Sequence, residues 1–219
     1  MARMERIRAD APDLKAAIRN NYDAIAARYD WVLGPPEWLG LRALRRNLLA
    51  RARGSVLEIA VGTGRNLPYY PPGCELHAID FSTPMLQRAG RRAAQLGRQV
   101  DLRLMDAEQL GFPAQSFDTV VCTLATCTFP HPELALREMA RVVRRDGQVL
   151  LLEHGYSSQP WLRKLQLQRA PRQFQWLGCR WDIEPHRIAE QAGLRLDEHR
   201  RYLLGILHWM VLRPNGTAQ

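Results

Sequence analysis

Short apolar runs alternate with amphipathic stretches over most of this chain. Strands are predicted at 55–60, 75–80, 100–105, 119–124 and 148–153, with helices near 65–70 and over 84–96 and 132–144. Each apolar run is short and bounded by glycine, proline or polar residues, which is typical of strands buried within a parallel sheet. Strands separated by helices predict right-handed crossovers between parallel neighbours.

The N-terminal part has a helical pattern. Over residues 11–30, apolar side chains that include Tyr22 and Tyr29 recur three or four positions apart, which predicts a helix with one apolar stripe. A break is expected at residues 34–36, Gly-Pro-Pro, and a second helix over 38–51.

The C-terminal part predicts a different connection. The strand-like segments 194–202 and 206–213 are joined by only three residues. A crossover needs a dozen or more residues, so these two strands are expected to pair as an antiparallel hairpin. The predicted fold class is therefore α/β: a doubly wound, Rossmann-like sheet of seven mostly parallel strands with an antiparallel last strand.

The most informative segment is the glycine turn that follows the first predicted strand. Residues 56–59 form a buried strand, and Gly62 and Gly64 follow where a ligand can lie against backbone that has no Cβ atoms. The second strand ends at Asp80, whose carboxylate can accept two hydrogen bonds from a ribose diol. This layout predicts a nucleotide-type site at the carboxyl edge of an α/β sheet.

A dinucleotide is not the ligand that this turn favours. The G-x-G-x-x-G fingerprint requires a third glycine where the chain has Leu67, so an NAD-linked oxidoreductase is only the rival enzyme class. Glu58 lies at the end of the strand, and a carboxylate there suits a ligand with cationic groups better than a phosphate. A ribose, an adenine and a positive charge together describe S-adenosylmethionine.

The run Glu58–Gly64 resembles the first motif of class I S-adenosylmethionine-dependent methyltransferases, E-x-G-x-G-x-G. The chain departs from it at Ala60, where the family usually has glycine; alanine is expected to be tolerated if its φ stays negative. Residues 106–108, Asp-Ala-Glu, resemble the stretch that holds the adenine. The resemblance implies S-adenosylmethionine as cofactor, no metal, and a cofactor site formed by Glu58, Ala60, Gly62, Gly64, Asp80, Phe81, Met85, Asp106, Ala107 and Thr123.

Within the superfamily, the chain is most similar to the methyltransferase type 11 group. Residues 121–124 and 152–154 resemble membrane-associated thiol methyltransferases and bacterial phospholipid N-methyltransferases, with quinone C-methyltransferases as more distant relatives. The expected function is methyl transfer to a small lipophilic acceptor, either a thiol or a phospholipid amine. Quinone C-methylation, and a noncatalytic membrane-associated S-adenosylmethionine-binding protein, are the alternatives.

Three residues are candidates for catalysis. His154 follows the fifth predicted strand, where the acceptor pocket is expected to open, and is a candidate base. Tyr22 and Tyr29 belong to a Y-D-x-x-A-x-x-Y-D pattern. This pattern resembles the N-terminal signature of quinone C-methyltransferases, in which that helix covers the cofactor. The structural alternatives are a loop cap for His154 and core aromatics for the two tyrosines.

Segment 155–181 is unusual in composition. It contains five basic residues and no acidic one, interleaved with Trp161, Phe174, Trp176 and Trp181. One interpretation is a helix with a solvated basic face and aromatic residues turned into the core. The other is a lid over the acceptor pocket that also contacts an anionic membrane. The net charge of +9 fits nucleic acid as well, but no RNA-recognition motif accompanies it, so no nucleic-acid partner is expected.

Length and cysteine content complete the prediction. The 219 residues are expected to form one domain with an N-terminal cover (1–51), a cofactor core (52–154), the basic insert (155–181) and a C-terminal helix and hairpin (182–219). The four cysteines are far apart and lack CxxC spacing, so neither a zinc site nor a disulfide framework is expected. Cytoplasmic residence is the default expectation, with peripheral membrane contact as a further one, and the oligomeric state is left open.

Overall fold

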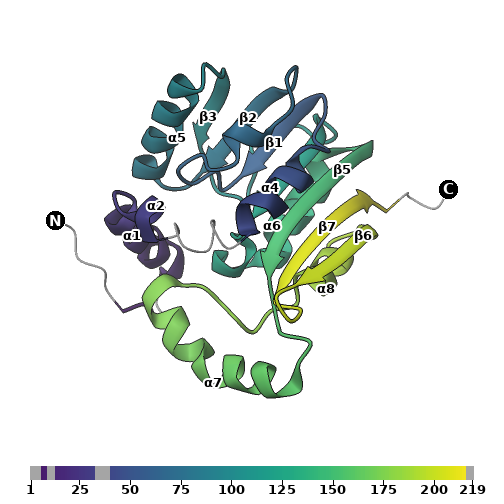
Figure 1. Cartoon of the computed structure of the whole chain (residues 1–219). Coiled ribbons are helices and arrows are strands. Elements are labelled where there is room, and N and C mark those ends of the chain that lie inside the picture. Colours follow the sequence, from purple (N-terminus) through teal and green to yellow (C-terminus); the bar gives the residue numbers. More distant parts are fainter. Residues whose placement is uncertain (1–5, 9–12, 33–39, 216–219) are drawn as a thin grey trace.

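A twisted sheet with helices on both faces forms the centre of the computed structural model (Figure 1), which describes residues 6–8, 13–32 and 40–215. The strands are β1 (Ser55–Ile59), β2 (Glu75–Asp80), β3 (Val100–Leu104), β4 (Phe117–Thr123), β5 (Val143–His154), β6 (Leu194–Tyr202) and β7 (Leu207–Pro214). The helices are α1 (Leu14–Ile25), α2 (Tyr29–Val32), α4 (Arg42–Leu49), α5 (Thr83–Gln95), α6 (Pro132–Val142), α7 (Pro160–Leu177) and α8 (Pro185–Gln191). Two 3₁₀ turns, η2 (Leu67–Tyr69) and η3 (Thr126–Thr128), follow β1 and β4.

The sheet confirms the predicted fold class. Its seven strands lie in the order β3-β2-β1-β4-β5-β7-β6. Strands β1 to β5 pair in parallel, whereas β7 is antiparallel to both β5 and β6, as the short hairpin link predicted. Side chains of β1 alternate between hydrophobic clusters on the two faces of the sheet. Leu57 and Ile59 pack in the cluster that includes residues of α6 and α8, and Val56 packs in the cluster that includes residues of α4.

The N-terminal segment differs from the single helix that was predicted. Helix α1 ends at Ile25, and the short helix α2 begins at Tyr29. The turn between them redirects the chain so that Asp30 reaches the glycine turn after β1. The predicted start at 11–12, the break at 34–36 and the first residues of the helix over 38–51 lie outside the described residues. The helix predicted near 65–70 is the 3₁₀ turn η2.

The basic insert forms α7, which lies outside the layers of the sheet and beside α1 (Figure 1). Trp161 is 65% exposed and Trp176 is 42% exposed, so the interpretation that the aromatic residues turn into the core is wrong for these two. Over the described residues, α7 and the other helices are all too short or too polar to cross a bilayer.

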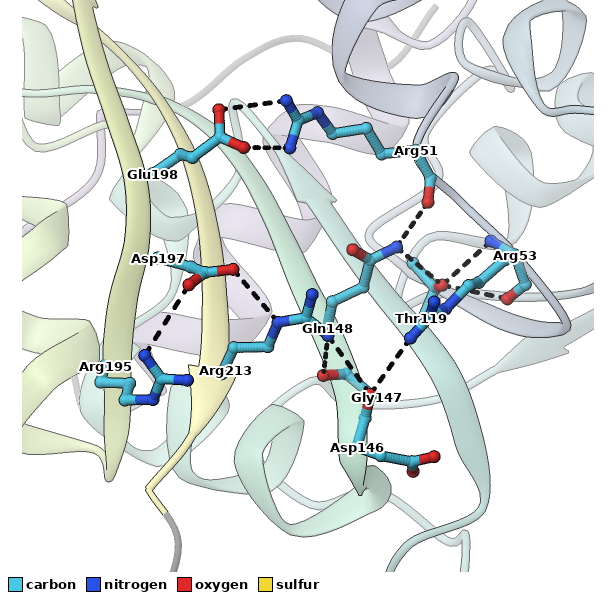
Figure 2. A network of polar contacts seen from close by, with 10 residues as sticks. All are labelled: Arg51, Arg53, Thr119, Asp146, Gly147, Gln148, Arg195, Asp197, Glu198 and Arg213. Atoms are coloured by element: carbon cyan, nitrogen blue, oxygen red, sulfur yellow. Dashed lines mark hydrogen bonds and ion pairs between the residues drawn. The ribbon is translucent and has the colours of Figure 1, made fainter.

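A polar network ties together the edge of the sheet where the parallel strands begin (Figure 2). Arg213 of β7 lies 3.3 Å from Asp197 of β6, and Arg51 pairs with Glu198. Arg213 also donates to the backbone carbonyl of Gly147 at 3.0 Å. These contacts hold the C-terminal hairpin to the parallel sheet, and they leave the opposite edge, where the strands end, for ligand binding.

Candidate functional site

The carboxyl ends of β1, β2 and β4 meet at one edge of the sheet, around Asp80. The carboxylate of Asp80 accepts backbone hydrogen bonds from Gly62 at 2.8 Å and from Ser82 at 2.9 Å. Burial raises the pKa of Asp80 to about 6, although these N–H groups oppose the shift. Each carboxylate oxygen has a second lone pair, so Asp80 retains the capacity to accept hydrogen bonds from a ribose diol.

The two glycines of the turn have different roles. Both have a positive φ, +56° at Gly62 and +79° at Gly64. A Cβ atom added at Gly62 would meet no atom within 4 Å, so this position keeps space open as expected. A Cβ atom at Gly64 would lie 2.8 Å from Leu67 and 3.2 Å from Ala89 of α5. Gly64 therefore allows the turn to pack against α5, and its contact with a cofactor stays a prediction.

Ala60 has a φ of +53°, so the condition under which alanine was expected to be tolerated, a negative φ, is not met. The chain leaves β1 through a left-handed conformation, which explains why glycine is usual at this position of the motif. Leu124, just after β4, has a φ of +54°. Both residues line the same cavity, so the ligand-facing edge of the sheet contains two sites of backbone strain.

Glu58 is buried under the glycine turn, with 3% of its surface exposed. Its carboxylate accepts hydrogen bonds from the Asn66 amide and from the Tyr70 hydroxyl, each at 2.8 Å. Burial raises the pKa of Glu58 to about 7 against the effect of these two bonds. The Arg45 guanidinium joins the network by donating to Asn66 and Thr123. Through these bonds Glu58 stabilises the segment that follows the glycine turn. Its direct contact with a cofactor stays a prediction.

Two adjoining cavities lie above this edge. Their shared lining residues are Ala60, Asp80, Phe81, Thr128 and Phe129. The predicted cofactor residues that line one or both are Ala60, Gly62, Asp80, Phe81, Met85, Asp106, Ala107 and Thr123, whereas Glu58 and Gly64 line neither. Their volumes are about 30 and about 60 Å³. A nucleoside-sized ligand needs several hundred Å³, so the segment that covers the cavities must move outward to admit it.

Helices α1 and α2 form that cover, and polar contacts fasten it at both ends. Lys15 of α1 pairs with Asp106, a predicted adenine-site residue. Asp30 of α2 accepts a hydrogen bond from the Thr63 hydroxyl at 2.6 Å and lies 2.6 Å from the Arg92 guanidinium. The cover is therefore attached to the glycine turn and to α5 by charged groups.

Tyr22 and Tyr29 project from this cover into the cavity that Asp80 lines. Their ring centroids are 6.2 Å apart. Burial raises the pKa of Tyr22 well above its usual value and that of Tyr29 to about 12. Both phenols therefore keep their protons at neutral pH and are hydrogen-bond donors rather than bases. They lie where the sequence predicted, and their catalytic role stays a prediction.

His154 does not line the cavity into which Tyr22 and Tyr29 project. Its Nε2 atom is 3.1 Å from the Cys179 sulfur, which is 3.3 Å from the Cys127 sulfur. The spacing of the cysteines along the sequence did not reveal this pair, because the fold closes a separation of 52 residues. Contact with Cys179 raises the pKa of His154, although burial opposes the shift. His154 also lines a mainly apolar cavity of about 360 Å³ with Trp181.

Sequence reasoning missed several residues of this edge. Thr128 and Phe129 line both cofactor cavities, and Lys15 lines one of them. The two residues after β4 were detectable in principle, because ligand sites form just beyond the carboxyl ends of parallel strands. Lys15 was not, because its position depends on how the cover packs.

Comparisons with known proteins agree with this geometry. The family described as Methyltransferase domain matches residues 57–151. Phosphatidylethanolamine N-methyltransferase of Cereibacter sphaeroides is 40% identical over 130 residues, which cover 58% of this chain and 64% of that protein. Thiol S-methyltransferase TMT1B of Homo sapiens is 33% identical over 138 residues, covering 56% and 55%. The chain thus spans less than two thirds of the length of these curated relatives.

A crystal structure of an S-adenosylmethionine-dependent methyltransferase from Aquifex aeolicus shares the fold, with a TM-score of 0.56, 15% identity and coverage of 78% of this chain and 88% of that one. The site fits the cofactor that such a domain implies. The space at Gly62 is open, Asp80 has acceptor capacity for a diol, and Phe81 and Ala107 supply apolar walls for a base. Residues 57–151, which include the glycine turn and Asp80, thus match a methyltransferase domain.

Proposed function

We propose that this protein transfers a methyl group from S-adenosylmethionine to the amine of a phospholipid headgroup. The observation that carries the proposal is a groove of about 870 Å³ next to the cofactor cavities. Phe129 and Pro130 line both the groove and one of those cavities. An acceptor lying in the groove is therefore within reach of the cofactor edge.

The groove has the amphiphilic character of a lipid. Ile18 of α1 and Leu167 and Phe174 of α7 give it apolar walls. Its charged lining residues are Arg6, Arg8, Arg180 and Asp182. Because the arginines outnumber the acid, the groove suits a phosphate attached to an apolar chain. The similarity to the phosphatidylethanolamine N-methyltransferase of Cereibacter sphaeroides supports the same acceptor class.

The main task of the site residues is to position the two reactants. The cofactor, when bound, supplies an activated sulfonium methyl group. The protein has to hold the acceptor nitrogen in line with it and exclude water, and the cover that contains Tyr22 and Tyr29 excludes water when it is closed. A headgroup amine is protonated at neutral pH and must lose a proton before attack. The rate is therefore expected to rise with pH.

A thiol is the second candidate acceptor. The cavity of about 360 Å³ at His154 is lined largely by apolar side chains such as Leu165 and Ile206, which suits a small lipophilic molecule. A thiol has an ordinary pKa of about 8.5, so it needs less help than an amine to become nucleophilic. Similarity to a human thiol S-methyltransferase supports this alternative.

The donor side is tested by calorimetry with S-adenosylmethionine. Replacing Asp80 by alanine removes the acceptors for the ribose diol and is expected to weaken binding by roughly 2 to 4 kcal/mol. Asp101→Ala is the matched control, because Asp101 pairs with Arg103 at the edge of the sheet and lines neither cofactor cavity. Equal affinities of the two variants would contradict the assignment of Asp80.

The acceptor side is tested with labelled cofactor and a panel of phosphatidylethanolamine, an alkyl thiol and a demethylquinone. We expect turnover of phosphatidylethanolamine that falls in Leu167→Gln, a groove variant, and not in Leu165→Gln, a variant of the His154 cavity. The reverse pattern with the thiol supports the second candidate. Cofactor binding without turnover of any acceptor favours a noncatalytic protein, and methylation of RNA or protein alone contradicts both acceptor proposals.

A further inference from the structure

Three potential ligand atoms for a soft metal lie close together near the carboxyl edge of the sheet. They belong to Cys127 of η3, His154 at the end of β5, and Cys179 just after α7, and all lie within 4.8 Å of one another. We propose that these residues bind a soft divalent cation of the zinc class. The proposal departs from the expectation of no metal, which rested on the family resemblance and on the spacing of the cysteines in the sequence.

The separations between the ligand atoms are slightly shorter than those of such a site. Tetrahedral zinc, with Zn–S bonds of about 2.3 Å, places two sulfur ligands roughly 3.8 Å apart. The sulfurs of Cys127 and Cys179 are 3.3 Å apart, and Nε2 of His154 is 3.1 Å from Cys179. Small rotations of the side chains open these distances enough for an ion. The set of two thiolates and an imidazole is one that zinc prefers over oxygen-ligated cations.

The backbone around the two cysteines is fixed. Gly178 ends α7 with a φ of +66°, and a Cβ atom there would lie 2.7 Å from Ile18 of α1. The next residues are bonded to the η3 segment: the Arg180 amide donates to the Cys127 carbonyl at 2.9 Å. The Arg180 guanidinium donates to the Phe129 carbonyl at 3.0 Å. Main-chain contacts therefore bring the cysteines together, as a preorganised metal site requires.

Among the described residues, a buried carboxyl group with one unpartnered oxygen lies next to the cluster. Glu153, which precedes His154, is fully buried and accepts backbone hydrogen bonds from Ala125 and Thr126 through Oε1. Its other oxygen, Oε2, has no hydrogen-bond partner within the described part of the chain. A buried polar atom without a partner is uncommon, so this oxygen marks the surroundings of the cluster as an incompletely satisfied polar region.

The site has three protein ligands among the residues that the structure describes. Zinc sites with three protein ligands keep a fourth position for water or substrate, unlike four-ligand structural sites. An acceptor thiolate could take that position, a role that rests on the second candidate function. Cation binding itself does not, and it releases to solvent the protons that the three side chains carry.

The test measures binding of Zn²⁺, and of Co²⁺ as a spectroscopic probe, to protein freed of metal by a chelator under reducing conditions. We expect one ion per chain and a thiolate-to-cobalt charge-transfer band. Cys127→Ser, Cys179→Ser and His154→Gln should each weaken binding at least tenfold. Cys74→Ser is the matched cysteine control, because Cys74 is remote and contacts the Ala52 carbonyl.

A second cluster provides the histidine control. His186, His199 and His208 also have ligand atoms within 4.8 Å of one another, but they offer imidazole only. His199→Gln should therefore leave the charge-transfer band unchanged. A charge-transfer band that survives the Cys127→Ser/Cys179→Ser double variant, or that disappears in His199→Gln, would overturn the proposal. So would the absence of any ion in reduced wild-type protein.

Cofactor calorimetry on the same variants separates this inference from the proposed function. Zinc binding without S-adenosylmethionine binding leaves the metal site standing and removes the methyltransferase proposal. Cofactor binding and turnover without a bound ion would support the methyltransferase proposal and overturn the metal site. Circular dichroism of each variant checks that a lost ion reflects a lost ligand rather than an unfolded chain.

Discussion

At the scale of single residues, Ala60 is the clearest site of strain. Its left-handed backbone costs an alanine about 1 kcal/mol, which glycine avoids. We expect Ala60→Gly to raise the free energy of unfolding by up to about 1 kcal/mol, measured by urea denaturation. Ala78→Gly is the matched control: Ala78 is buried in β2, and glycine there should destabilise by a similar amount. Loss of stability in both variants would show that Ala60 is not strained.

The titration of Asp80 gives a second prediction at this scale. Its pKa of about 6 reflects burial, and hydrogen bonds from a ribose diol or a nearby positive charge favour the ionised form. Cofactor binding should therefore lower this pKa, so affinity rises with pH up to the region above pH 6 and then levels off. Calorimetry between pH 5 and 8 measures the trend.

Two variants show which carboxyl group causes the rise of cofactor affinity with pH. Asp80→Asn cannot ionise and should bind weakly, with the rise across pH 6 removed. Glu58, with a pKa of about 7, titrates nearby, and Glu58→Gln reports its share. A rise that persists in Asp80→Asn and vanishes in Glu58→Gln would assign the effect to the network under the turn.

Which of these residues the sequence could predict depends on how local their environment is. Asp80 and Gly62 follow directly from a strand end and a turn, and the structure places both at the cavity. Glu58 belongs to the same motif, but its partners Asn66 and Tyr70 come from the turn packing back beneath the strand. A motif places a residue along the chain and does not reveal which side of the turn its side chain will face.

At the scale of elements, the cover formed by α1 and α2 controls access to the cavities. Asp30 joins α2 to Thr63 and Arg92 through a side chain that is 34% exposed. An exposed pair contributes about 1 kcal/mol or less, so Asp30→Asn should loosen the cover without unfolding the protein. We expect faster hydrogen exchange in residues 14–32 and several-fold faster dissociation of S-adenosylmethionine.

The matched control for this variant is Asp197→Asn at the opposite edge of the sheet (Figure 2). Asp197 is also partly exposed and pairs with Arg213 and Arg195. It should leave both the exchange of the cover and cofactor dissociation unchanged. If Asp30→Asn behaves like this control, the cover is held by packing rather than by its ion pairs.

Elements were predictable where their determinants are local. The β6–β7 hairpin follows from a link that is too short for a crossover, and the parallel strands follow from short apolar runs. The separation of α1 from α2 was missed because apolar spacing continues through the turn between them. The meeting of Cys127 with Cys179 was missed for another reason: it requires α7 to return the chain to η3 across 52 residues.

At the scale of the whole molecule, α7 gives one end of the protein a distinctive surface. It combines Trp161, Trp176 and Leu167, all more than 40% exposed, with four basic residues and no acid. Figure 1 shows this helix outside the sheet layers, and its inner side lines the groove proposed for the acceptor. A helix that both lines the acceptor groove and has tryptophan and arginine on its surface suits the interface of an anionic membrane.

This arrangement predicts salt-sensitive binding to anionic vesicles. Each basic residue near such a surface contributes about 1 kcal/mol at low salt, so the basic residues of α7 together give binding that sedimentation can detect. At roughly 0.5 M salt, screening should remove most of it. Trp161→Ala should weaken binding several-fold, whereas Leu104→Ala, which removes an equally exposed apolar side chain from the edge strand β3, should not. Equal effects of the two substitutions, or binding that salt does not weaken, would show that α7 does not face the membrane. The lipid acceptor would then have to reach the groove as a free molecule.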